Sequence, residues 1–503
     1  MSLHKARKFE KFKSESELLR ELFLSNLGTD KQMKVAAVKY GGSALARAEY
    51  IERHAEIARD LLKEHQKVIV VVSGAGDITD RLDSSLEEVE KLKYGIVDKT
   101  HFQRITDPSY VFSPWEDLYK AVGSPKCLGE VRSSVYNDFG SKVRDFLPQV
   151  RTEGERNLTE AVIHLYPEQL QAELVNCIYR KAGLESICVN FDSSLFPLVV
   201  NGHFLNGTVD LKETRRMCNS LFHSTDAEVI VVPGYGGKDG GERKTLGRGG
   251  SDTANFGYVY GFRADQNFIL TDVEGFKEAI FNGKETKTVK EVDIAEVAAG
   301  AFYGAKLPSG DSLEPLIAFH SEGANPEVYI AHHQNPWGEK SRIVKETSDG
   351  PNVKFVAGRK DIMLYRVRGN INQLLGRLDE NGVDYYSGGT RRYANIVLNQ
   401  KGKKIGESEI DKFAAKSEIV VEEKRNNMAL VGIIGEGVQR TEGIASDMLQ
   451  RLRREEINIE ELTIDISPVS FGTLVSNEDL NRAIGALYDE FFSKAYSGSS
   501  VAK

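Results

Sequence analysis

The sequence is poor in the residues that build disulfide-stapled or zinc-dependent folds. It has four cysteines in 503 residues, widely separated and without a C-x-x-C pair: Cys127, Cys177, Cys188 and Cys218. This spacing excludes a disulfide framework and a zinc knuckle. His332 and His333 are adjacent and would point to opposite faces of a strand, and the other histidines show no ligand spacing. We expect free thiols in a reducing compartment and no metal ion held by side chains.

An excess of basic charge and a long apolar run are also absent. Lysine and arginine number 66 against 74 aspartates and glutamates, and the net charge of -8 argues against a nucleic-acid partner. No apolar run approaches the roughly 18 residues of a membrane span. Residues 1–33 are charged and lack the apolar core of a signal peptide. We therefore expect a soluble cytoplasmic protein with a helical N-terminal extension over residues 1–33, and neither nucleic acid nor a membrane as partner.

The composition is that of a globular protein, with 40% hydrophobic and 28% charged residues. At roughly 100 to 200 residues per domain, the chain should hold two to four domains. The first clear unit is a short apolar strand from Val35 that breaks at Gly41-Gly42 and is followed by a helix. A second apolar strand over residues 68–72 ends in Ser73-Gly74-Ala75-Gly76. This alternation predicts an α/β sheet with ligands at the carboxyl ends of its strands.

Within the part of the chain that carries this α/β pattern, one stretch has weak hydrophobic periodicity. Residues 91–153 show little periodicity and contain Asp107-Pro108, Ser113-Pro114 and Ser124-Pro125, which we interpret as turn signals in an inserted, lid-like subdomain. Periodicity returns in a helix that closes at Gly183, and apolar strands follow at 229–232 and at 269–272. We place the end of this part near residue 345.

The remainder of the chain consists of short β-α-β units. The first, over residues 353–427, has a helix near 371–378 and a strand at 394–398. The second, over residues 428–495, starts with an apolar strand and continues with a helix whose apolar positions are 445, 448, 449 and 452. Two similar units in tandem indicate an internal repeat.

Two glycine-rich segments are suited to binding anions. Gly41-Gly42 allows backbone N–H groups to approach a phosphate, and Lys39 supplies a cation beside them, although a tight turn with an exposed lysine has the same pattern. The loop Thr245-Leu246-Gly247-Arg248-Gly249-Gly250-Ser251-Asp252 is more specific. Its arginine suits bidentate recognition of a carboxylate, and its serine stands at a helix start that can bind an anion.

Four segments together resemble the signature segments of aspartokinases, in order and in spacing. They are Lys39-Tyr40-Gly41-Gly42-Ser43, the loop from Thr245 to Asp252, Thr271-Asp272-Val273-Glu274-Gly275 and Phe302-Tyr303-Gly304-Ala305-Lys306. The tail resembles the paired regulatory ACT domains of that family, most clearly over residues 429–491. The resemblance implies an amino-acid-kinase-type three-layer α/β sandwich over residues 34–345, followed by two α+β ACT-like (βαββαβ) domains.

The resemblance also implies an activity. It is transfer of the γ-phosphate of ATP to the side-chain carboxylate of L-aspartate, giving an acyl phosphate, under feedback control by an amino acid bound at the ACT domains. Members of the family pair through ACT units, so a homodimer or homotetramer is expected. Mg²⁺ would be held mainly by the phosphates and water.

The residue roles follow from the same likeness. Lys39 would stabilise the phosphoryl group in flight, with Asp252 as the second catalytic residue. Arg248 would bind the substrate α-carboxylate, and Glu168, fifteen residues before Gly183 as in the family, its ammonium group. A surface glutamate on a helix is an equally good interpretation of Glu168. The remaining substrate positions are Ser43, Thr79 and Ser251, and the nucleotide positions are Gly41, Gly42, Thr271, Asp272 and Lys306.

Several positions depart from the family pattern. The usual tyrosine and Asp-Pro-Arg after the Thr-Asp segment are replaced by Lys277 and Ile280-Phe281-Asn282, and the usual His-Pro by Ser309-Gly310. Pro167-Glu168-Gln169 replaces Gly-Glu-Arg, and Ser43-Ala44 replaces Thr-Ser. Two alternatives therefore stay open: a kinase for another small amino acid carboxylate, and a catalytically weak paralogue that senses an amino acid.

Overall fold

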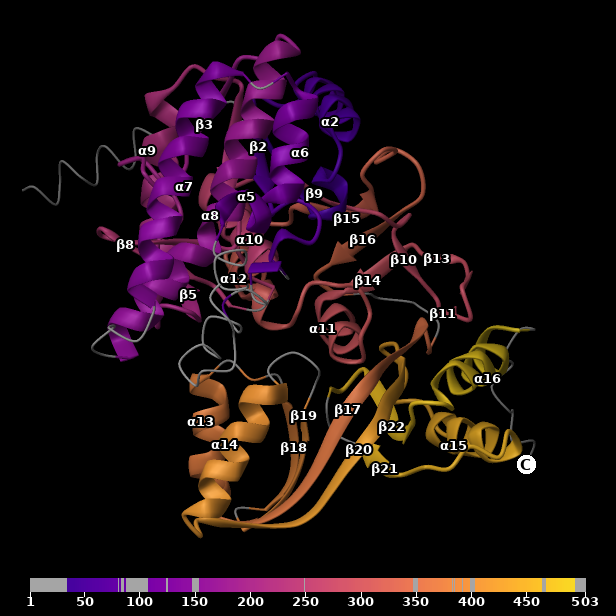
Figure 1. The fold of residues 1–503 in the computed structure, drawn as a ribbon. Coiled ribbons are helices and arrows are strands. Elements are labelled where there is room, and N and C mark those ends of the chain that lie inside the picture. Colours follow the sequence, from indigo (N-terminus) through magenta and orange to yellow (C-terminus); the bar gives the residue numbers. More distant parts are fainter. Residues whose placement is uncertain are drawn as a thin grey trace, which may run out of the picture.

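The computed structural model of the chain describes residues 34–79, 81–82, 86, 107–123, 125–146, 153–247, 249–346, 352–381, 383, 385–390, 392–398, 403–463 and 467–493 (Figure 1). The helical extension predicted for residues 1–33 lies outside these residues. A larger α/β unit occupies the upper part of Figure 1, and a smaller, sheet-based unit lies below it.

The larger unit is built on an eight-stranded sheet. In sheet order its strands are β14 (Glu291–Asp293), β16 (Lys340–Val344), β15 (Glu327–His332), β9 (Gln266–Thr271), β1 (Val35–Tyr40), β2 (Lys67–Val72), β6 (Val229–Pro233) and β3 (Ser186–Cys188). Strands β15 to β3 run parallel, while β16 pairs antiparallel with β15 and β14 follows the direction of β16. Strands β2 and β6 are fully buried and apolar except for Lys67 at the start of β2, because helices cover both faces.

The two faces of this sheet have separate cores. Val38 of β1 packs with one set of helices and its neighbour Ala37 with the other, as the period of two requires. The first set is α2 (Ala48–Leu61), α5 (Pro108–Val111), α6 (Ser113–Ala121), α7 (Lys126–Phe146) and α8 (Glu153–Lys181). The second set is α9 (Leu211–Ser224), α10 (Gly250–Phe262) and α12 (Glu314–Ser321). The predicted three-layer α/β sandwich is confirmed.

The insertion or lid-like subdomain expected for residues 91–153 stays a prediction, and the structure describes part of this stretch as helices. That part consists of α5, α6, α7 and the start of α8, and Trp115 and Phe139 are buried in the same core as β1. Pro108 and Pro114 stand in the first turns of α5 and α6. Proline is favoured there because the first N–H groups of a helix have no internal partner, so these dipeptides mark helix starts rather than loops.

Short hairpins and one helix complete the larger unit. The hairpins are β4 (Val200–Gly202) with β5 (Gly207–Val209), β7 (Gly236–Asp239) with β8 (Glu242–Thr245), β10 (Phe276–Lys277) with β13 (Thr288–Val289), and β11 (Ile280–Phe281) with β12 (Lys284–Glu285). The helix, α11 (Ile294–Phe302), starts with a capping box formed by Asp293 and Glu296.

The smaller unit is an antiparallel sheet of six strands. Their order is β18 (Tyr385–Thr390), β19 (Tyr393–Leu398), β17 (Phe355–Gly369), β20 (Ile419–Ile434), β22 (Ser470–Ser476) and β21 (Glu461–Thr463). Helices α13 (Ile371–Glu380) and α14 (Lys403–Ala415) pack on one half, and α15 (Ile444–Arg454) and α16 (Leu480–Phe492) on the other. The predicted antiparallel α+β regulatory part is confirmed.

The two long strands belong to both halves of this sheet. Phe355 at the start of β17 pairs with Ile434 at the end of β20, whereas Gly369 at the end of β17 pairs with Ile419 at the start of β20. The first strand of the first repeat, β17, therefore also completes the sheet of the second repeat with its starting residues. The division into 353–427 and 428–495 stays a prediction, and the structure adds that the two repeats are interleaved.

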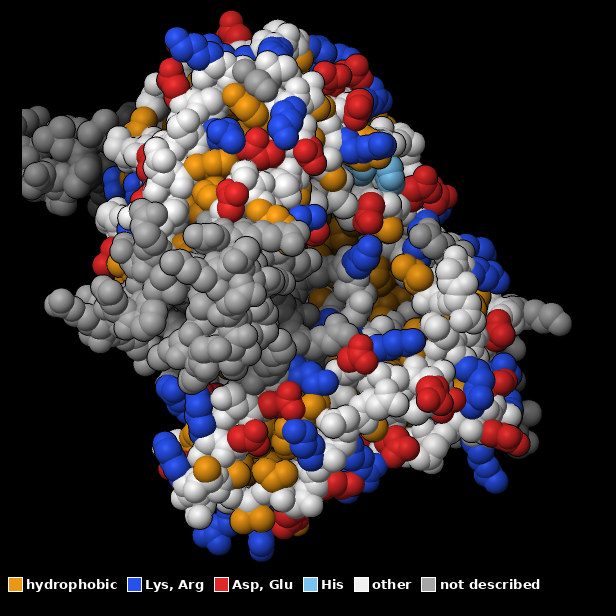
Figure 2. Space-filling model, in the orientation of Figure 1, with side chains coloured by type: hydrophobic (Ala, Val, Ile, Leu, Met, Phe, Trp, Pro, Cys, Tyr) orange, Lys and Arg blue, Asp and Glu red, His pale blue; other side chains and the backbone are white. Residues whose placement is uncertain are grey.

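The charges on the surface and the length and polarity of the helices can be compared with the partners expected from the sequence. On the face that Figure 2 shows, lysines and arginines alternate with aspartates and glutamates, without a continuous basic stripe among the described residues. Every helix in the described ranges is too short or too polar to span a lipid bilayer. Within the described part of the chain, Cys177, Cys188 and Cys218 form no disulfide.

Candidate active site

Glycine loops meet at the carboxyl ends of the parallel strands. Gly42 follows β1 and Gly76 follows β2, and the Gly76 N–H donates to the Gly42 carbonyl at 3.0 Å. A Cβ on Gly42 would lie 2.7 Å from the carbonyl oxygen of Gly74. After β6, the Gly234 N–H donates to the Val72 carbonyl at 2.8 Å. The three loops therefore form one closely packed edge whose backbone is accessible to a ligand.

Lys39 and Asp252, the two predicted catalytic residues, meet at this edge. Lys39 extends from the end of β1, and Asp252 stands in the first turn of α10, after Gly249 with φ of 71°. Lys39 Nζ and Asp252 Oδ1 are 2.7 Å apart, with 12% and 21% of the side chains exposed. The pair is thus half-enclosed but open to a ligand, and the start of α10 favours the carboxylate.

Glu168 lies beside them and is not a surface residue. It is 3% exposed, and its Oε2 has no hydrogen-bond partner among the described residues. Burial raises the pKa of Glu168 to about 8, against the opposing effects of the Gly74 N–H and, more weakly, of the Lys39 charge. The structure therefore excludes the surface interpretation and places a desolvated carboxyl group within electrostatic reach of Lys39. Its role as the ammonium partner stays a prediction.

Three of the other predicted substrate positions lie in or against the glycine loops. Ser43 is exposed at the start of a 3-10 turn, Ser43–Leu45. Thr79 is half-buried, and its Oγ1 would lie 3.5 Å from a Cβ on Gly74. Ser251 packs against Gly234, because a Cβ added to Gly234 would lie 3.2 Å from the Cβ of Ser251. Arg248 lies outside the described residues.

The nucleotide positions form a second group at the end of β9. Thr271 Oγ1 donates to Asp272 Oδ1 at 3.0 Å, and Lys306 Nζ is 3.5 Å from Asp272 Oδ2. Burial tends to raise the pKa of Asp272, but the charge of Lys306 and the Thr271 hydroxyl together lower it below its usual value. Lys306 is 72% exposed, so its ammonium group remains available to an anion.

The residues that depart from the family pattern have structural roles. Lys277 is buried and its Nζ donates to Thr288 Oγ1 at 3.0 Å. Asn282 and Gly283 have φ of 50° and 71°, which is the turn of the β11–β12 hairpin. Phe281 of that hairpin packs against Tyr488 of α16, with ring centroids 5.8 Å apart. Of these residues, Phe281 makes a contact with the regulatory part.

Gly74 and His333 are site residues that the sequence reasoning missed. Gly74 supplies a backbone N–H to the Glu168 carboxyl group, and the signal was its position in the glycine loop after β2. The His333 N–H donates to the Thr271 carbonyl at 2.8 Å, and its Nδ1 is 3.3 Å from Nε2 of His54. Burial lowers the pKa of His333 to about 4. No sequence pattern pairs these two histidines.

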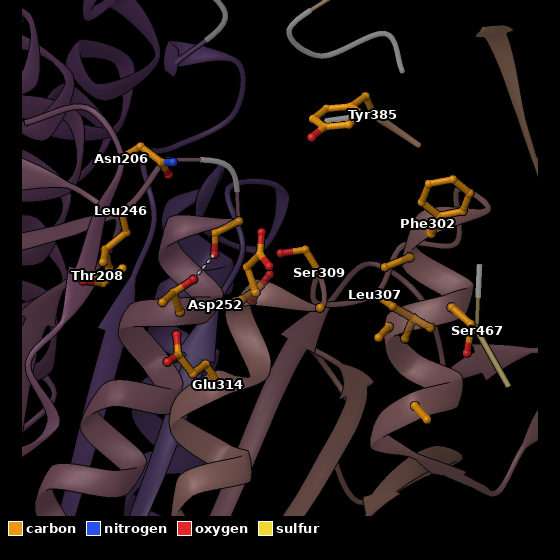
Figure 3. A pocket seen from close by; sticks show the side chains of 18 of the residues that line it. Asn206, Thr208, Leu246, Asp252, Phe302, Leu307, Ser309, Glu314, Tyr385 and Ser467 are labelled. Carbon is orange, nitrogen blue, oxygen red and sulfur yellow. Dashed lines mark hydrogen bonds between the residues drawn. The ribbon is translucent and has the colours of Figure 1, made fainter. Parts of the chain in front are cut away.

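A cavity of about 1040 Å³ separates Asp252 from the regulatory part. Figure 3 shows Asp252 and Ser309 on the side of the larger unit, Phe302 from α11, and Tyr385 from β18 on the opposite side. Among the described residues, no three histidines, cysteines or carboxylates are grouped to hold a metal ion.

Comparison with known proteins agrees with this architecture. A sequence model of the amino acid kinase family matches residues 34–313, more than half of the chain, and a model of the ACT domain matches residues 431–491. Aspartokinase 3 of Bacillus subtilis (strain 168) is 24% identical over 493 residues, covering 92% of this chain and 99% of its own. The aspartokinase of Mycolicibacterium smegmatis is 24% identical over 486 residues, covering 91% and 96%.

Solved structures show the same fold. E. coli aspartokinase III in complex with aspartate and ADP superposes with a TM-score of 0.73 at 18% identity, covering 91% of this chain and 100% of that one. Its complex with lysine and aspartate gives a TM-score of 0.67 at 18% identity, covering 91% and 99%. The chain therefore belongs to the amino acid kinase family, carries a C-terminal ACT domain, and has aspartokinases as relatives along nearly its whole length.

Proposed function

We propose that this protein phosphorylates the side-chain carboxylate of L-aspartate with ATP, giving an acyl phosphate. The observation on which this rests most is the Lys39–Asp252 ion pair of 2.7 Å beside the buried Glu168. Phosphoryl transfer needs positioning and charge stabilisation more than covalent help from the protein. The Lys39 cation, held where the glycine loops meet, supplies both positioning and charge stabilisation.

Within this proposal Lys39 and Asp252 act as a unit. The Lys39 ammonium group neutralises negative charge that spreads over the moving phosphoryl group. Asp252 holds the lysine side chain in place, because a charge-assisted contact of this length restricts its rotamers. Neither residue needs to form a covalent bond with the substrate.

The acceptor side combines three kinds of group. The desolvated Glu168 carboxyl group accepts the substrate ammonium, which restores its ionised form. Arg248, on the strength of the resemblance alone, binds the α-carboxylate. Ser43, Thr79 and Ser251 complete the substrate site around the glycine loops. A substrate with an amino group and two carboxylates matches this arrangement.

The nucleotide side fits ATP with Mg²⁺. Gly41 and Gly42 leave the backbone open where a phosphate approaches, and the exposed Lys306 supplies a second cation. The described residues contain no cage of three metal ligands. As the resemblance implies, Mg²⁺ would be held mainly by the phosphates and water.

The ACT-like sheet makes the enzyme responsive to an amino acid. The relative from E. coli was solved with lysine and aspartate, and we extend amino acid feedback to this chain without naming the effector. We also propose a homodimer or homotetramer formed through ACT units in the cytoplasm. Sedimentation with and without a panel of amino acids tests the assembly.

A coupled assay for ADP release over a panel of amino acids tests the activity. We expect turnover with L-aspartate, little with L-glutamate or L-asparagine, and a kcat about 10² to 10³-fold lower for a Lys39→Met variant. Turnover with a different small amino acid would reassign the acceptor. No turnover with any of them, despite measurable ATP binding, would refute the kinase assignment and favour the sensor alternative.

A further inference from the structure

Helix α11 and the residues after it lie between the two units (Figure 1). They lead from the larger unit to Lys306, whose ammonium group faces Asp272 at the end of β9. Tyr303, three residues before Lys306, is fully buried. It packs in a core to which both the larger unit and the regulatory sheet contribute. The position of Lys306 therefore depends on what holds Tyr303.

Tyr303 occupies a slot made by two glycines. Gly432 of β20 and Gly472 of β22 stand directly opposite each other in the antiparallel register. A Cβ on either glycine would lie 2.4 Å from Tyr303 Cε1, which is far inside contact distance. The ring thus packs directly against the backbone of the regulatory sheet at these two glycines.

The slot is on the sheet face opposite α15 and α16. Along β20, Leu430 and Ile434 share the core of Tyr303, while Val431 and Ile433 pack toward those two helices. Gly432 lies in phase with Leu430 and Ile434, as alternation requires. Glycine weakens a strand interior and marks a place where another group approaches closely. Two glycines paired across strands at this one point therefore indicate a specific seat for the tyrosine ring.

Contacts on both sides of Tyr303 fix the same segment. A Cβ on Gly304, which has φ of 99°, would lie 3.0 Å from the Gly358 carbonyl oxygen. Arg359 Nη2 donates to the Ala301 carbonyl at 2.6 Å. Earlier in α11, Glu296 pairs with Lys354 at 2.7 Å. The helix that leads to Lys306 is thus held by the regulatory sheet along its length.

We propose that Tyr303, seated between Gly432 and Gly472, is a positioning residue that sets Lys306 against Asp272 for nucleotide binding. The proposal rests on the assignment of the nucleotide side under the proposed function. It makes the geometry of two regulatory strands part of the ATP site. A shift of β20 against β22 changes ATP affinity first and aspartate affinity little.

Gly472→Ala and Gly432→Ala test this, because each adds one methyl group in the slot. The matched control is Gly376→Ala in α13 of the same sheet unit, where a Cβ meets nothing within 4 Å. Titration calorimetry with Mg²⁺-ATP should show a Kd raised about tenfold for the slot variants, the effect of losing one charge-assisted contact. The KM for aspartate should stay within about twofold, and the control should match the wild type.

A double-mutant cycle separates positioning from general damage. In a Lys306→Ala background, Gly472→Ala should raise the Kd for ATP no further, because the contact that it displaces is already gone. Tyr303→Leu, which empties the slot without a clash, provides the same cycle if the alanine variants fold poorly.

Additive effects with Lys306→Ala, an unchanged Kd for ATP in Gly472→Ala and Tyr303→Leu, or an equal rise in both substrate constants would overturn the proposal. A wild-type protein that does not bind ATP would also overturn it. ATP binding without aspartate turnover would refute the proposed function only, because the cycle is measured by direct binding.

Discussion

Lys39 at the end of β1 and Asp252 in the first turn of α10 form an ion pair of 2.7 Å at the edge where the glycine loops meet. The two residues come from distant parts of the sequence, and α10 contacts β1 directly. The pair lies beside a carboxyl group, Glu168, that the fold keeps away from water. This arrangement holds the Lys39 ammonium group where negative charge would develop on a transferred phosphoryl group.

Removal of either partner should lower turnover strongly. Lys39→Met and Asp252→Asn should each reduce kcat about 10² to 10³-fold, the usual effect of one lost charge-stabilising group. The double variant should lose little more than the Lys39 variant, because the two residues act as a unit. Steady-state ADP release measures this. Lys63→Met, which breaks the exposed pair with Asp60 of the same 2.7 Å length, is the control and should leave kcat unchanged.

The pKa of Glu168 predicts a pH-dependent stability. Burial raises this pKa to about 8, above its ordinary value of 4.5. Between those two values the folded protein holds a proton that the unfolded chain has lost, so this group makes the free energy of unfolding fall as pH rises. The slope is at most about 1.4 kcal/mol per pH unit. Glu168→Gln should flatten the pH dependence in urea titrations from pH 5 to 8, and an unchanged slope would contradict the burial argument.

The same group predicts how aspartate binding responds to pH. The substrate ammonium pairs with the ionised carboxylate, so binding near pH 7 should release a proton from Glu168. The KM for aspartate should therefore fall as pH rises from 6 toward 8. Calorimetry in buffers of different ionisation enthalpy measures the released proton directly. A KM for aspartate independent of pH, in a protein where Glu168→Gln also leaves it unchanged, would show that Glu168 does not bind the substrate.

The Glu296–Lys354 pair predicts a stabilising link between the two units. Its atoms are 2.7 Å apart, and the side chains are 0% and 4% exposed. Lys354→Met leaves the Glu296 carboxylate with the N–H groups of Asp293 and Glu436 but without this cation. We expect a loss of about 3 kcal/mol, because a buried charge that loses its ionic partner is costly. Thermal unfolding should show it, with Lys63→Met as a surface control that changes stability by less than about 0.5 kcal/mol.

Gly42 predicts how closely the glycine loops must pack. Gly42→Ala brings a Cβ to 2.7 Å from the Gly74 carbonyl oxygen, so the loops after β1 and β2 must separate. Turnover should fall at least about tenfold, since a small misplacement near the reacting groups is costly. Gly241→Ala, in a turn where a Cβ meets nothing within 4 Å, should match the wild type in the same assay. Equal activity of the two variants would show that the loop contact is not required.

Local patterns predicted the elements that depend on local physics. The apolar runs of β1 and β2 and the helix periodicity of α2 and α15 needed only burial and alternation. The glycine segments after the strands predicted the position of the site, because parallel strands bring their carboxyl ends to one edge. The resemblance added Glu168, which no periodicity singles out.

The remainder depended on long-range packing. The burial of Glu168 depends on how α8, which continues through Pro167 as one helix, packs in the core, whereas the sequence left a surface glutamate on a helix as an equally good interpretation. The interleaving of β17 and β20 is a choice of pairing partners between distant segments, which no local signal specifies. The slot for Tyr303 needs Gly432 and Gly472 to be in register, and each glycine alone resembles any other in a strand.

The most direct test of the proposed activity identifies the phosphorylated product. An acyl phosphate reacts with hydroxylamine to give a hydroxamate, so incubation of the protein with ATP, Mg²⁺, L-aspartate and hydroxylamine should accumulate aspartate hydroxamate in equal amount to ADP. Mass spectrometry should place the hydroxamate on the side-chain carboxylate, and the Lys39→Met variant should form it at least about 10²-fold more slowly. ADP release without any hydroxamate, or a hydroxamate on the α-carboxylate, would contradict the account.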